Sequence, residues 1–373
     1  MLPFIDLKHQ YGLIREDIQK GIDAVLEHGH YILGEEVGRL EAQLAAYAGT
    51  KYALCCSSGT DALLLALMAM GIGSGDAVIT TPFTFFATPE TIALAGATPV
   101  FADIDEDTYN IDPAKLEEAV RKVRAEGKLN LKAVMPVDLF GQTADYGAIR
   151  AIADKYSLRI IEDACQGFGA QDGSGRTAPA FGDVGCTSFF PAKPLGCYGD
   201  GGAVFTDDAE LYEKMFSILV HGRSRTDKYD NLRLGLNARM DTIQAAVLLA
   251  KLKIFPGEIE KRQAVANAYL EELKGLVKTP RILPGYRSVW AQFCCRSPRF
   301  AEIQAALKEH DIPTARYYPI PMHLLQALKY LGGAKGDFPA AEACASDIFA
   351  LPMHPYLERE TIHTIAEVIA RTV

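Results

Sequence analysis

Seven short apolar runs constrain the fold of this chain more than any other feature of the sequence. They cover residues 52–56, 77–81, 99–102, 133–137, 158–161, 184–189 and 203–206. Apolar runs of this length are typical of strands that are buried on both faces of a sheet. Several intervening segments, such as 61–70 and 113–126, have the periodicity of helices instead. The alternation predicts an α/β fold with a mixed, mainly parallel seven-stranded sheet and helices on both of its faces.

The pattern changes after residue 240. Two long helical segments, 240–254 and 256–273, are followed by a strand candidate at 289–296 and a helix at 300–310. We therefore expect two domains. Residues 1–240, which begin with a short N-terminal segment, would form a large α/β domain, and residues 241–373 a smaller α+β domain.

Charge and targeting signals exclude several classes of protein. The net charge of -9 argues against a surface that neutralises a nucleic acid or an anionic membrane. The N-terminus lacks the features of a secretory signal, and no apolar run approaches the roughly 18 residues of a membrane span. We therefore expect a cytoplasmic protein.

Disulfides and metal sites are not expected either. The eight cysteines include adjacent pairs at 55–56 and 294–295, in strand-like runs where neighbouring side chains point to opposite faces. The eight histidines show no metal-ligand spacing. The sequence therefore predicts buried, reduced thiols and no metal.

Lys193 lies in an unusual local sequence. Prolines flank it at positions 191 and 194, and four glycines follow between residues 196 and 202. Such a segment cannot belong to a regular element, so it predicts a tightly shaped loop. The apolar pair Phe189–Phe190 indicates burial, and burial lowers the pKa of an ammonium group. These features favour a nucleophilic amine over a solvated surface lysine.

Two other segments carry candidate chemistry. Asp163 follows an apolar run at the carboxyl end of a predicted strand, the edge where open α/β sheets bind ligands. A carboxylate there can keep a pyridine nitrogen protonated, although a helix cap or a loop ion pair would explain it as well. Residues 57–61, Ser-Ser-Gly-Thr-Asp, join a predicted strand to a predicted helix whose N-terminus could hold a phosphate. A simple N-cap by Ser58 or Thr60 is the alternative.

These three segments resemble those of the DegT/DnrJ/EryC1/StrS family of sugar aminotransferases. Members of this family use pyridoxal 5'-phosphate (PLP) and have the fold of the aspartate aminotransferase type, PLP fold type I. The resemblance extends almost end to end, from residues 4–7 and 31–34 into the C-terminal domain, with the motifs in the family's order. It implies a transferase that takes an amino group from L-glutamate and passes it to a nucleotide-linked keto sugar.

The resemblance also implies roles for single residues. Lys193 is the lysine that forms the Schiff base with PLP and shuttles the proton. Asp163 is the partner of the pyridine nitrogen, and Gln166 the partner of the ring hydroxyl. The positions that match the family's phosphate-binding residues are Gly59, Thr60 and Ser188.

Two further positions follow from the family's motifs. Phe85, within residues 81–88, matches an aromatic residue that lies against the cofactor ring; a plain core phenylalanine is the alternative. Asn237, within residues 235–241, matches an asparagine that reaches the cofactor phosphate of the neighbouring subunit, although a helix cap would also explain it. The resemblance therefore implies a homodimer with shared active sites.

Substrate contacts are expected from two regions. Basic residues surround Asn237 at positions Arg223, Arg225, Lys228, Arg233 and Arg239. In an acidic chain this local excess is a candidate for binding a diphosphate or a sugar carboxylate, with a solvated loop as the alternative. Arg239 is the first candidate because it lies inside the family's motif. Candidate sugar contacts from the C-terminal domain are Tyr317, Tyr318 and His323, which would otherwise be ordinary hydrogen-bonded loop residues.

Within the family, the sequence is most similar to 3-aminotransferases of UDP-linked 2-acetamido-2-deoxy-3-keto sugars, with a glucose or glucuronic acid ring. These enzymes serve the biosynthesis of bacterial surface polysaccharides or lipid A. Tyr317 departs from the His-Tyr-Pro of uronate-specific relatives, which leaves a neutral hexose open. Cys165, Gly167 and Asp138 also depart from the residues common in the family, at strand ends near the cofactor.

Three other functions remain as alternatives. An aminotransferase for a 4-keto-6-deoxy sugar would use the same cofactor residues. A PLP-dependent sugar dehydratase of this family has histidine in place of the lysine, so Lys193 argues against it. A non-catalytic regulator could retain the fold, but the joint presence of Lys193, Asp163, Gln166 and Asn237 argues against that as well.

Overall fold

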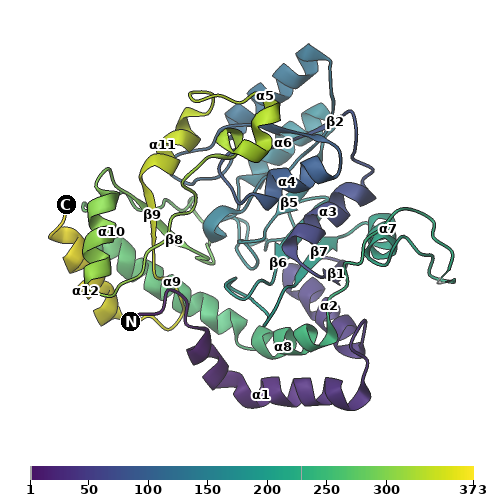
Figure 1. Cartoon of the computed structure of the whole chain (residues 1–373), viewed down its shortest axis with the longest axis horizontal. Coiled ribbons are helices and arrows are strands. Elements are labelled where there is room, and N and C mark those ends of the chain that lie inside the picture. Colours follow the sequence, from purple (N-terminus) through teal and green to yellow (C-terminus); the bar gives the residue numbers. More distant parts are fainter. Residues whose placement is uncertain (1, 228) are drawn as a thin grey trace.

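A mixed β-sheet forms the centre of the protein (Figure 1), as seen in a computed structural model that describes residues 2–227 and 229–373. Its seven strands are β1 (Tyr52–Cys56), β2 (Asp76–Thr80), β3 (Thr98–Phe101), β4 (Asn130–Val134), β5 (Arg159–Asp163), β6 (Val184–Ser188) and β7 (Gly202–Thr206). They follow the order β1-β7-β6-β5-β4-β2-β3, and only β7 runs antiparallel to its neighbours. The predicted α/β fold and its mainly parallel sheet are confirmed.

Strand β4 lies three residues earlier than the predicted run 133–137. The backbone N–H of Met135 still donates to the carbonyl oxygen of Ile79 at 2.7 Å. Pro136 follows, and a proline has no N–H for a further bond along the strand. The apolar run therefore continues past the point where the regular strand ends.

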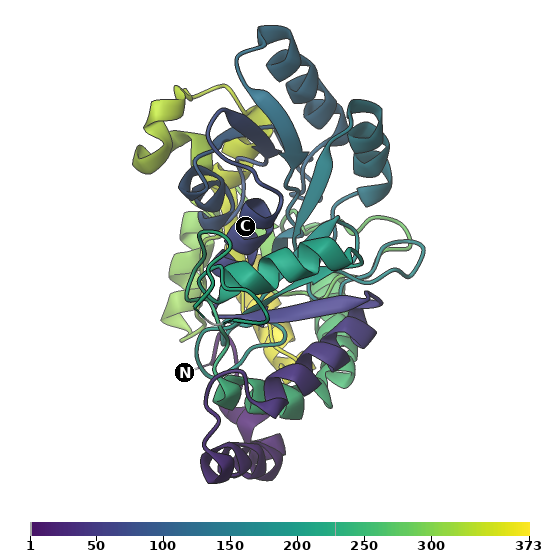
Figure 2. The same cartoon turned by 90° about the vertical axis from the view of Figure 1, so that its right-hand side faces the viewer.

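Helices cover both faces of the sheet (Figure 2). Strand side chains alternate between the two cores, so that Cys55 and Ile160 face one and Leu54 and Ile161 the other. Helices of the first face are α2 (Glu35–Ala48), α5 (Pro113–Glu126), α6 (Tyr146–Tyr156) and α8 (Thr242–Leu252). Those of the second face are α3 (Gly59–Ala69), α4 (Ala87–Leu94) and α7 (Ala209–Leu219). The carboxyl ends of the parallel strands are left for the segments that carry the candidate chemistry.

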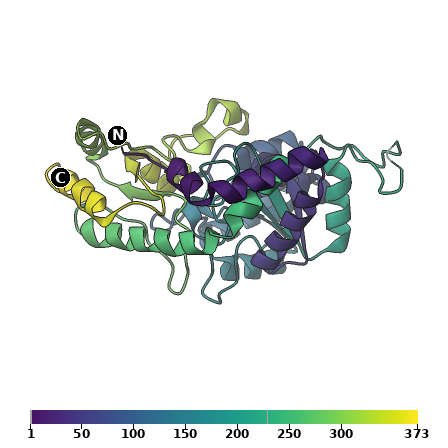
Figure 3. The same ribbon diagram turned by 90° about the horizontal axis from the view of Figure 1, so that it is seen from below.

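The N-terminal segment is a 22-residue helix, α1 (Leu7–His28), and not the short segment that the sequence suggested. Asp6 caps its start by accepting a 2.9 Å bond from the N–H of His9, and Gly29 ends it with a φ of 70°. Ile18 and Val25 are buried, whereas most of the helix is exposed, and α1 lies along α8 (Figure 3). Ile14, Ile18, Ile22 and Val25 recur along it at helical spacing, so the apolar pattern of this helix was present in the sequence.

The C-terminal part has a core of its own. The strands β8 (Phe293–Arg296) and β9 (Ile348–Leu351) pair antiparallel. They pack with α10 (Phe300–Glu309) and α12 (Arg359–Ala370) around Trp290, which is buried. Shorter elements of this part are η2 (Met322–Leu324), η3 (Gln326–Leu331) and α11 (Pro339–Asp347), while η1 (Leu139–Gly141) belongs to the sheet region.

The expected domain boundary between residues 240 and 241 stays a prediction, and the packing of α8 and of the helix that follows it favours a later position. Helix α8 contributes Leu248 to the core of the sheet, so it belongs with the large unit. Helix α9 (Phe255–Glu272) is shared, because Ile259 packs in the core of the sheet and Val265 in the C-terminal core. We propose that the two domains meet within α9, between these two residues.

No helix in the two described ranges is both long enough and apolar enough to cross a membrane. The eight cysteines are all free, and only Cys165 is not fully buried. The predicted burial of the cysteines is thus confirmed for seven of the eight.

Candidate active site

Lys193 lies on a loop that begins where β6 ends. The loop is closed by a 2.7 Å bond from the N–H of Phe189 to the carbonyl oxygen of Gly201. Within it, the N–H of Lys193 donates to the carbonyl oxygen of Phe190 at 2.8 Å. The expected loop is confirmed, and because β6 pairs with β5, it places Lys193 beside the end of β5 that carries Asp163.

The amine of Lys193 has a poorly solvated environment. Burial lowers the pKa of Lys193 from its ordinary value, and the neighbouring Cys165 and Asp163 oppose the shift. No ion pair involves this side chain within residues 2–227 and 229–373. Desolvation therefore increases the unprotonated fraction, which is the form that attacks a carbonyl carbon.

Asp163, the last residue of β5, is held as a buried carboxylate at the sheet edge. Its side chain is 3% exposed. Oδ2 accepts a 2.8 Å bond from the hydroxyl of Thr88 on α4, and Oδ1 accepts a 3.2 Å bond from the N–H of Cys165. Two donors from different elements thus fix the plane of the carboxylate while its neighbour Lys193 stays free.

Gln166 connects the sheet to the C-terminal part of the chain. Its Oε1 accepts a 2.8 Å bond from the N–H of Phe140, and its Nε2 donates to the hydroxyl of Tyr318 at 3.0 Å. Burial raises the pKa of Tyr318 well above its ordinary value, so the phenol stays protonated. The ring of Phe85 lies 6.2 Å from that of Tyr318 and is 55% exposed. Phe85 is therefore accessible on the side of the site that Tyr318 borders.

Tyr317 lies next to Tyr318 but makes different contacts. Its ring is 6.4 Å from that of Phe4, edge to face, so it packs on the N-terminal segment. Burial raises the pKa of Tyr317 as well. Its predicted role as a sugar contact stays a prediction.

The turn from β1 into α3 forms a cradle beside this loop. Ser58 is the N-cap, and its Oγ accepts a 3.0 Å bond from the N–H of Asp61. The backbone N–H groups of Gly59 and Thr60 have no acceptor within the described chain. A Cβ on Gly59 would lie 2.6 Å from that of Ser188, so only glycine leaves this space open. Free N–H groups at a helix N-terminus bind anions, so capping and anion binding are compatible here.

Asn237 and Arg239 lie on the segment that leads into α8. Asn237 is exposed, and Arg239 is half-buried, with a buried Nε that has no hydrogen-bond partner within the described residues. Next to them, residues Tyr31–Leu33 are exposed and connect to this segment through a bridge between Ile32 and Asp241. Neither Asn237 nor Arg239 is thus committed to a contact that would prevent it from reaching another molecule.

The basic residues of the preceding loop differ in their environment. Arg225 makes two hydrogen bonds to Glu213, at 2.8 and 3.0 Å, and stacks on Phe216 with 3.5 Å to the ring centroid. The guanidinium group of Arg225 is therefore already engaged in contacts within its own chain. Arg233 is exposed, Arg223 is half-buried, and Lys228 lies outside the described residues.

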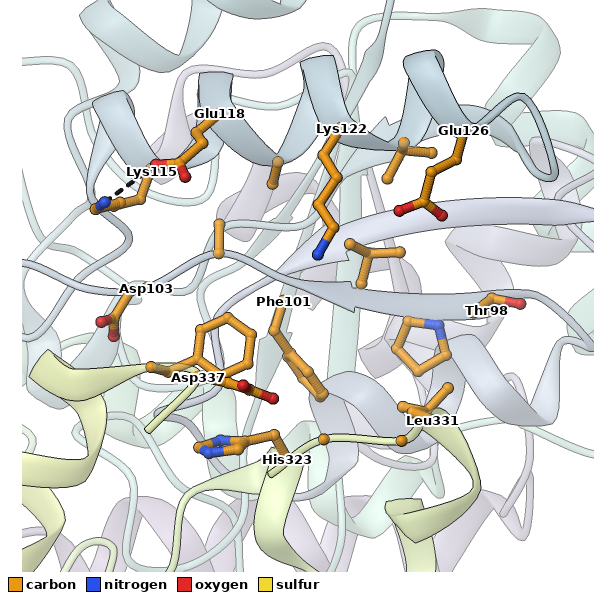
Figure 4. Close-up of a pocket in the computed structure, with 18 of the residues that line it drawn as sticks. Thr98, Phe101, Asp103, Lys115, Glu118, Lys122, Glu126, His323, Leu331 and Asp337 are labelled. Atoms are coloured by element: carbon orange, nitrogen blue, oxygen red, sulfur yellow. Dashed lines mark hydrogen bonds and ion pairs between the residues drawn. The ribbon is translucent and has the colours of Figure 1, made fainter. Parts of the chain in front are cut away.

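His323 lies apart from these groups. Its Nε2 is 3.1 Å from Oε1 of Glu342, and its side chain is 1% exposed. It borders a cavity of about 550 Å³ between β3, α5 and the segment around Leu331, and none of the cavity's lining residues is a candidate cofactor contact (Figure 4). The structure therefore does not bring His323 together with the other predicted site residues.

The site also contains residues that the sequence did not single out. Thr88 was part of the 81–88 segment, but nothing in the local sequence marked it as the partner of Asp163.

Two carboxyls, Asp138 and Glu162, are fully buried behind the site. Burial raises the pKa of Glu162 to about 7 and, together with the charge of Glu162, raises the pKa of Asp138. Asp138 appeared in the sequence only as an unusual residue at a strand end.

Curated relatives match the whole chain. A UDP-2-acetamido-2-deoxy-3-oxo-D-glucuronate aminotransferase of Pseudomonas aeruginosa is 48% identical over 366 residues, 98% of each chain. A protein of Geobacillus stearothermophilus named as a pleiotropic regulatory protein is 44% identical over 99% of this chain and 98% of its own. A UDP-N-acetyl-3-dehydro-alpha-D-glucosamine 3-aminotransferase of Acidithiobacillus ferrooxidans is 40% identical over 100% of this chain and 98% of its own.

Solved structures agree with the fold and the cofactor. A DegT DnrJ EryC1 StrS aminotransferase from Brucella abortus superposes with a TM-score of 0.97 at 47% identity, covering 100% of this chain and 99% of that one. NtdA from Bacillus subtilis, solved with its bound cofactor PMP, has a TM-score of 0.87 at 30% identity, over 98% of this chain and 83% of its own. The model of the DegT/DnrJ/EryC1/StrS aminotransferase family matches residues 13–370. With Lys193, Asp163 and the α3 N-terminus in place, the chain belongs to this family and is a PLP-dependent sugar aminotransferase.

Proposed function

We propose that the enzyme transfers an amino group from L-glutamate to C3 of a UDP-linked 2-acetamido-2-deoxy-3-keto sugar. The observation that carries the chemistry is the position of the desolvated amine of Lys193 next to the buried carboxylate of Asp163. The 3-keto position is supported by the two relatives named for 3-oxo sugars, at 48% and 40% identity.

PLP fits the residues that surround Lys193. The N–H groups of Gly59 and Thr60 would hold its phosphate, together with the hydroxyl of Ser188, in the space that a side chain on Gly59 would fill. Phe85 would lie against its ring. When bound, PLP supplies an electron sink for the charge that develops at the carbon losing its proton.

The protein's own groups then have distinct tasks. Lys193 links the cofactor covalently and, once released, moves the proton between the two carbons that exchange it. Asp163 keeps the ring nitrogen protonated, because a fixed carboxylate stabilises the cationic form. Gln166 binds the ring hydroxyl, and its bond to Tyr318 ties that contact to the C-terminal domain.

The active form is a homodimer with shared sites. Two segments next to Asn237 expose apolar side chains: Leu234, three residues earlier, is 89% exposed, and Ile32, which bridges to Asp241, is 43% exposed. Exposed large apolar side chains on neighbouring segments support an interface with another chain there. Asn237 would reach the cofactor phosphate of the partner subunit, and Arg239, with its unpaired Nε, would bind the diphosphate or a carboxylate of the substrate.

Both a glucuronic acid and a neutral glucose ring fit this proposal. The higher identity favours the uronate, whereas Tyr317 at the position of a histidine in uronate-specific relatives favours the neutral hexose. The product would serve a bacterial surface polysaccharide or lipid A, made in the cytoplasm. An aminotransferase for a 4-keto-6-deoxy sugar is the second candidate, and a regulator without activity is the third, because one relative is named for regulation.

Turnover with defined substrates tests the proposal. The purified enzyme is given L-glutamate and either the 3-keto uronate, the neutral 3-keto sugar or a 4-keto-6-deoxy sugar, all UDP-linked, and 2-oxoglutarate formation is measured. We expect kcat/KM for one 3-keto sugar to exceed that for the 4-keto sugar by about 100-fold or more. An equal or higher value for the 4-keto sugar would overturn the assignment, and no turnover with any sugar would favour the regulator.

A further inference from the structure

Lys251 is a buried lysine that the proposed reaction does not use. It lies in the last turn of α8 and is 1% exposed. Its Nζ donates a 2.6 Å hydrogen bond to the carbonyl oxygen of Gly196 and lies 4.2 Å from the ring centroid of Tyr198. Both contacts are to the loop that carries Lys193, three and five residues further along the chain.

The ammonium of Lys251 has no carboxylate bonded to it in the part of the chain that the structure describes. Glu258 is the nearest acidic influence, but its carboxylate accepts two bonds from Gln10 and one from Tyr356. Burial lowers the pKa of Lys251 to about 8. A buried ammonium without an ion-pair partner is costly, so a plain packing role would be met better by an apolar side chain.

Gln244, two turns earlier on α8, holds the same loop. Its Oε1 accepts a 2.8 Å bond from the N–H of Tyr198. A Cβ on Gly199 would lie 2.9 Å from Nε2 of Gln244, so the loop backbone packs directly on this side chain. One stripe of α8 therefore provides two polar contacts to the loop.

The position of Gly196 affects the backbone on both sides of Lys193. A Cβ on Gly196 would lie 2.6 Å from the carbonyl oxygens of both Phe190 and Pro191, which precede Lys193. The loop thus folds back, so that Gly196 touches the chain on the other side of Lys193. A displacement of Gly196 must move the backbone on both sides of the lysine.

We propose that Lys251 is a positioning residue: by binding the carbonyl of Gly196, it fixes the backbone on either side of Lys193 and keeps the amine in its desolvated place. The inference deepens the proposed function, on which it rests. Lys251 itself touches neither the cofactor nor the sugar. Displacement of a reacting group by about 1 Å can cost up to about 100-fold in rate, so a small loosening of the loop has a large effect.

Lys251→Met tests this role, because methionine fills similar space without a donor or a charge. The matched control is Lys253→Met, which removes an exposed lysine paired with Asp17 at 2.8 Å. We expect Lys251→Met to lower kcat by about 10- to 100-fold with KM for the keto sugar within about twofold. The control should keep both constants.

A second measurement does not depend on turnover. In the cofactor-free protein, Lys193 is labelled with acetic anhydride over a range of pH, and its peptide is quantified by mass spectrometry. The looser loop hydrates the amine, so the pKa of Lys193 should rise by about one unit in Lys251→Met. A merely structural role for Lys251 would leave this pKa unchanged.

The outcomes separate the two proposals. If borohydride does not fix PLP on Lys193 in the wild type, the proposed function fails whatever Lys251 does. If the wild type is labelled there but Lys251→Met keeps the wild-type kcat and the wild-type pKa of Lys193, the positioning role is wrong. If Lys251→Met does not fold, Gln244→Met replaces it, with the same expectations at a smaller magnitude.

Discussion

The hydroxyl of Thr88 donates a 2.8 Å hydrogen bond to Oδ2 of Asp163, so that a residue on α4 holds the carboxylate at the end of β5. Thr88 is 1% exposed, and its hydroxyl also lies 2.9 Å from that of Thr84. The carboxylate is therefore oriented from a helix that is not adjacent to it along the chain. In the proposed function, this contact sets the direction from which Asp163 would approach the ring nitrogen of PLP.

Thr88→Val should weaken cofactor binding and slow the reaction. Valine has the shape of threonine but no donor, so the carboxylate of Asp163 loses one of the two hydrogen bonds that orient it. Hydrogen bonds to charged groups contribute about 1.5 to 3 kcal/mol, so we expect about a tenfold or greater loss in PLP affinity or in kcat. Fluorescence titration with PLP and steady-state kinetics measure the two effects.

Thr91→Val is the control for that change. Thr91 is on the same helix and is fully buried, but its hydroxyl donates to the carbonyl oxygen of Thr88 at 3.1 Å and not to Asp163. It should lower the unfolding free energy by about 1 kcal/mol and leave PLP affinity unchanged. Equal losses of PLP affinity in both variants would mean that the bond to Asp163 has no special role.

The contact between Thr88 and Asp163 shows what the sequence could not predict. The strand that delivers Asp163 was predictable, because its apolar run reports burial and its end falls at the edge where ligands bind. The partner of the carboxylate was not, because Thr88 precedes it by 75 residues. The bond from Gln166 to Tyr318, 152 residues apart, was hidden in the same way. The local sequence pattern indicates which residues are buried and where helices begin and end. It does not indicate which elements, distant in the sequence, come into contact.

Helix α1 shows the same limit in the fold. Its cap residues, Asp6 and Gly29, and its apolar residues at helical spacing were readable signals, but the helix on which it packs was not. The helix is stabilised by α8, more than 200 residues later. Lys251 is a further example. It is a lysine in an apolar helix, and nothing in the sequence near it predicts its hydrogen bond to the loop of Lys193.

Gly59→Ala should specifically impair phosphate binding. The new Cβ would lie 2.6 Å from Cβ of Ser188 and 2.9 Å from Sγ of Cys165, so one wall of the cradle must move. The φ of Gly59 is not in the left-handed region, so alanine is not strained by backbone conformation. We expect PLP affinity to fall by about tenfold or more while the protein remains folded. Gly12→Ala, where nothing lies within 4 Å, should instead keep the affinity and raise the unfolding free energy by about 0.5 to 1 kcal/mol.

The buried pair Asp138 and Glu162 should make the protein less stable as the pH rises. Burial is the first cause of the raised pKa in both groups, and Glu162 reaches about 7 although the N–H groups of Phe181 and Gly182 oppose the shift. An acid whose pKa is raised by folding contributes its full stability below the unfolded pKa of about 4 and loses it as the pH rises through the folded value. We expect the contribution of this pair to the unfolding free energy to fall from about pH 4 through about pH 8, measured by urea titration at each pH.

Asp138→Asn isolates this pair. Asparagine keeps an oxygen for the N–H of Ala144, which bonds to Asp138 at 3.0 Å, and cannot ionise. The loss of stability between about pH 4 and pH 8 should become smaller but not vanish, because burial also raises the pKa of Glu41 to about 7. Glu118→Gln, at an exposed ion pair, should leave the pH dependence as it is. An unchanged pH dependence of stability in Asp138→Asn would contradict the raised pKa of Asp138.

Mixed dimers should recover activity if Asn237 acts across the interface. Asn237→Asp places a negative charge where the partner's phosphate would bind, and Lys193→Ala removes the linking amine, so each variant alone should be inactive. In a mixed dimer, the Lys193 of the Asn237→Asp chain faces the intact Asn237 of the other chain. Random reassociation makes half of the dimers mixed, each with one intact site of two, so about a quarter of the wild-type activity should return. Mixing without subunit exchange should return none. If reassociated mixtures also remain inactive, Asn237 serves its own chain, and the shared site must be abandoned.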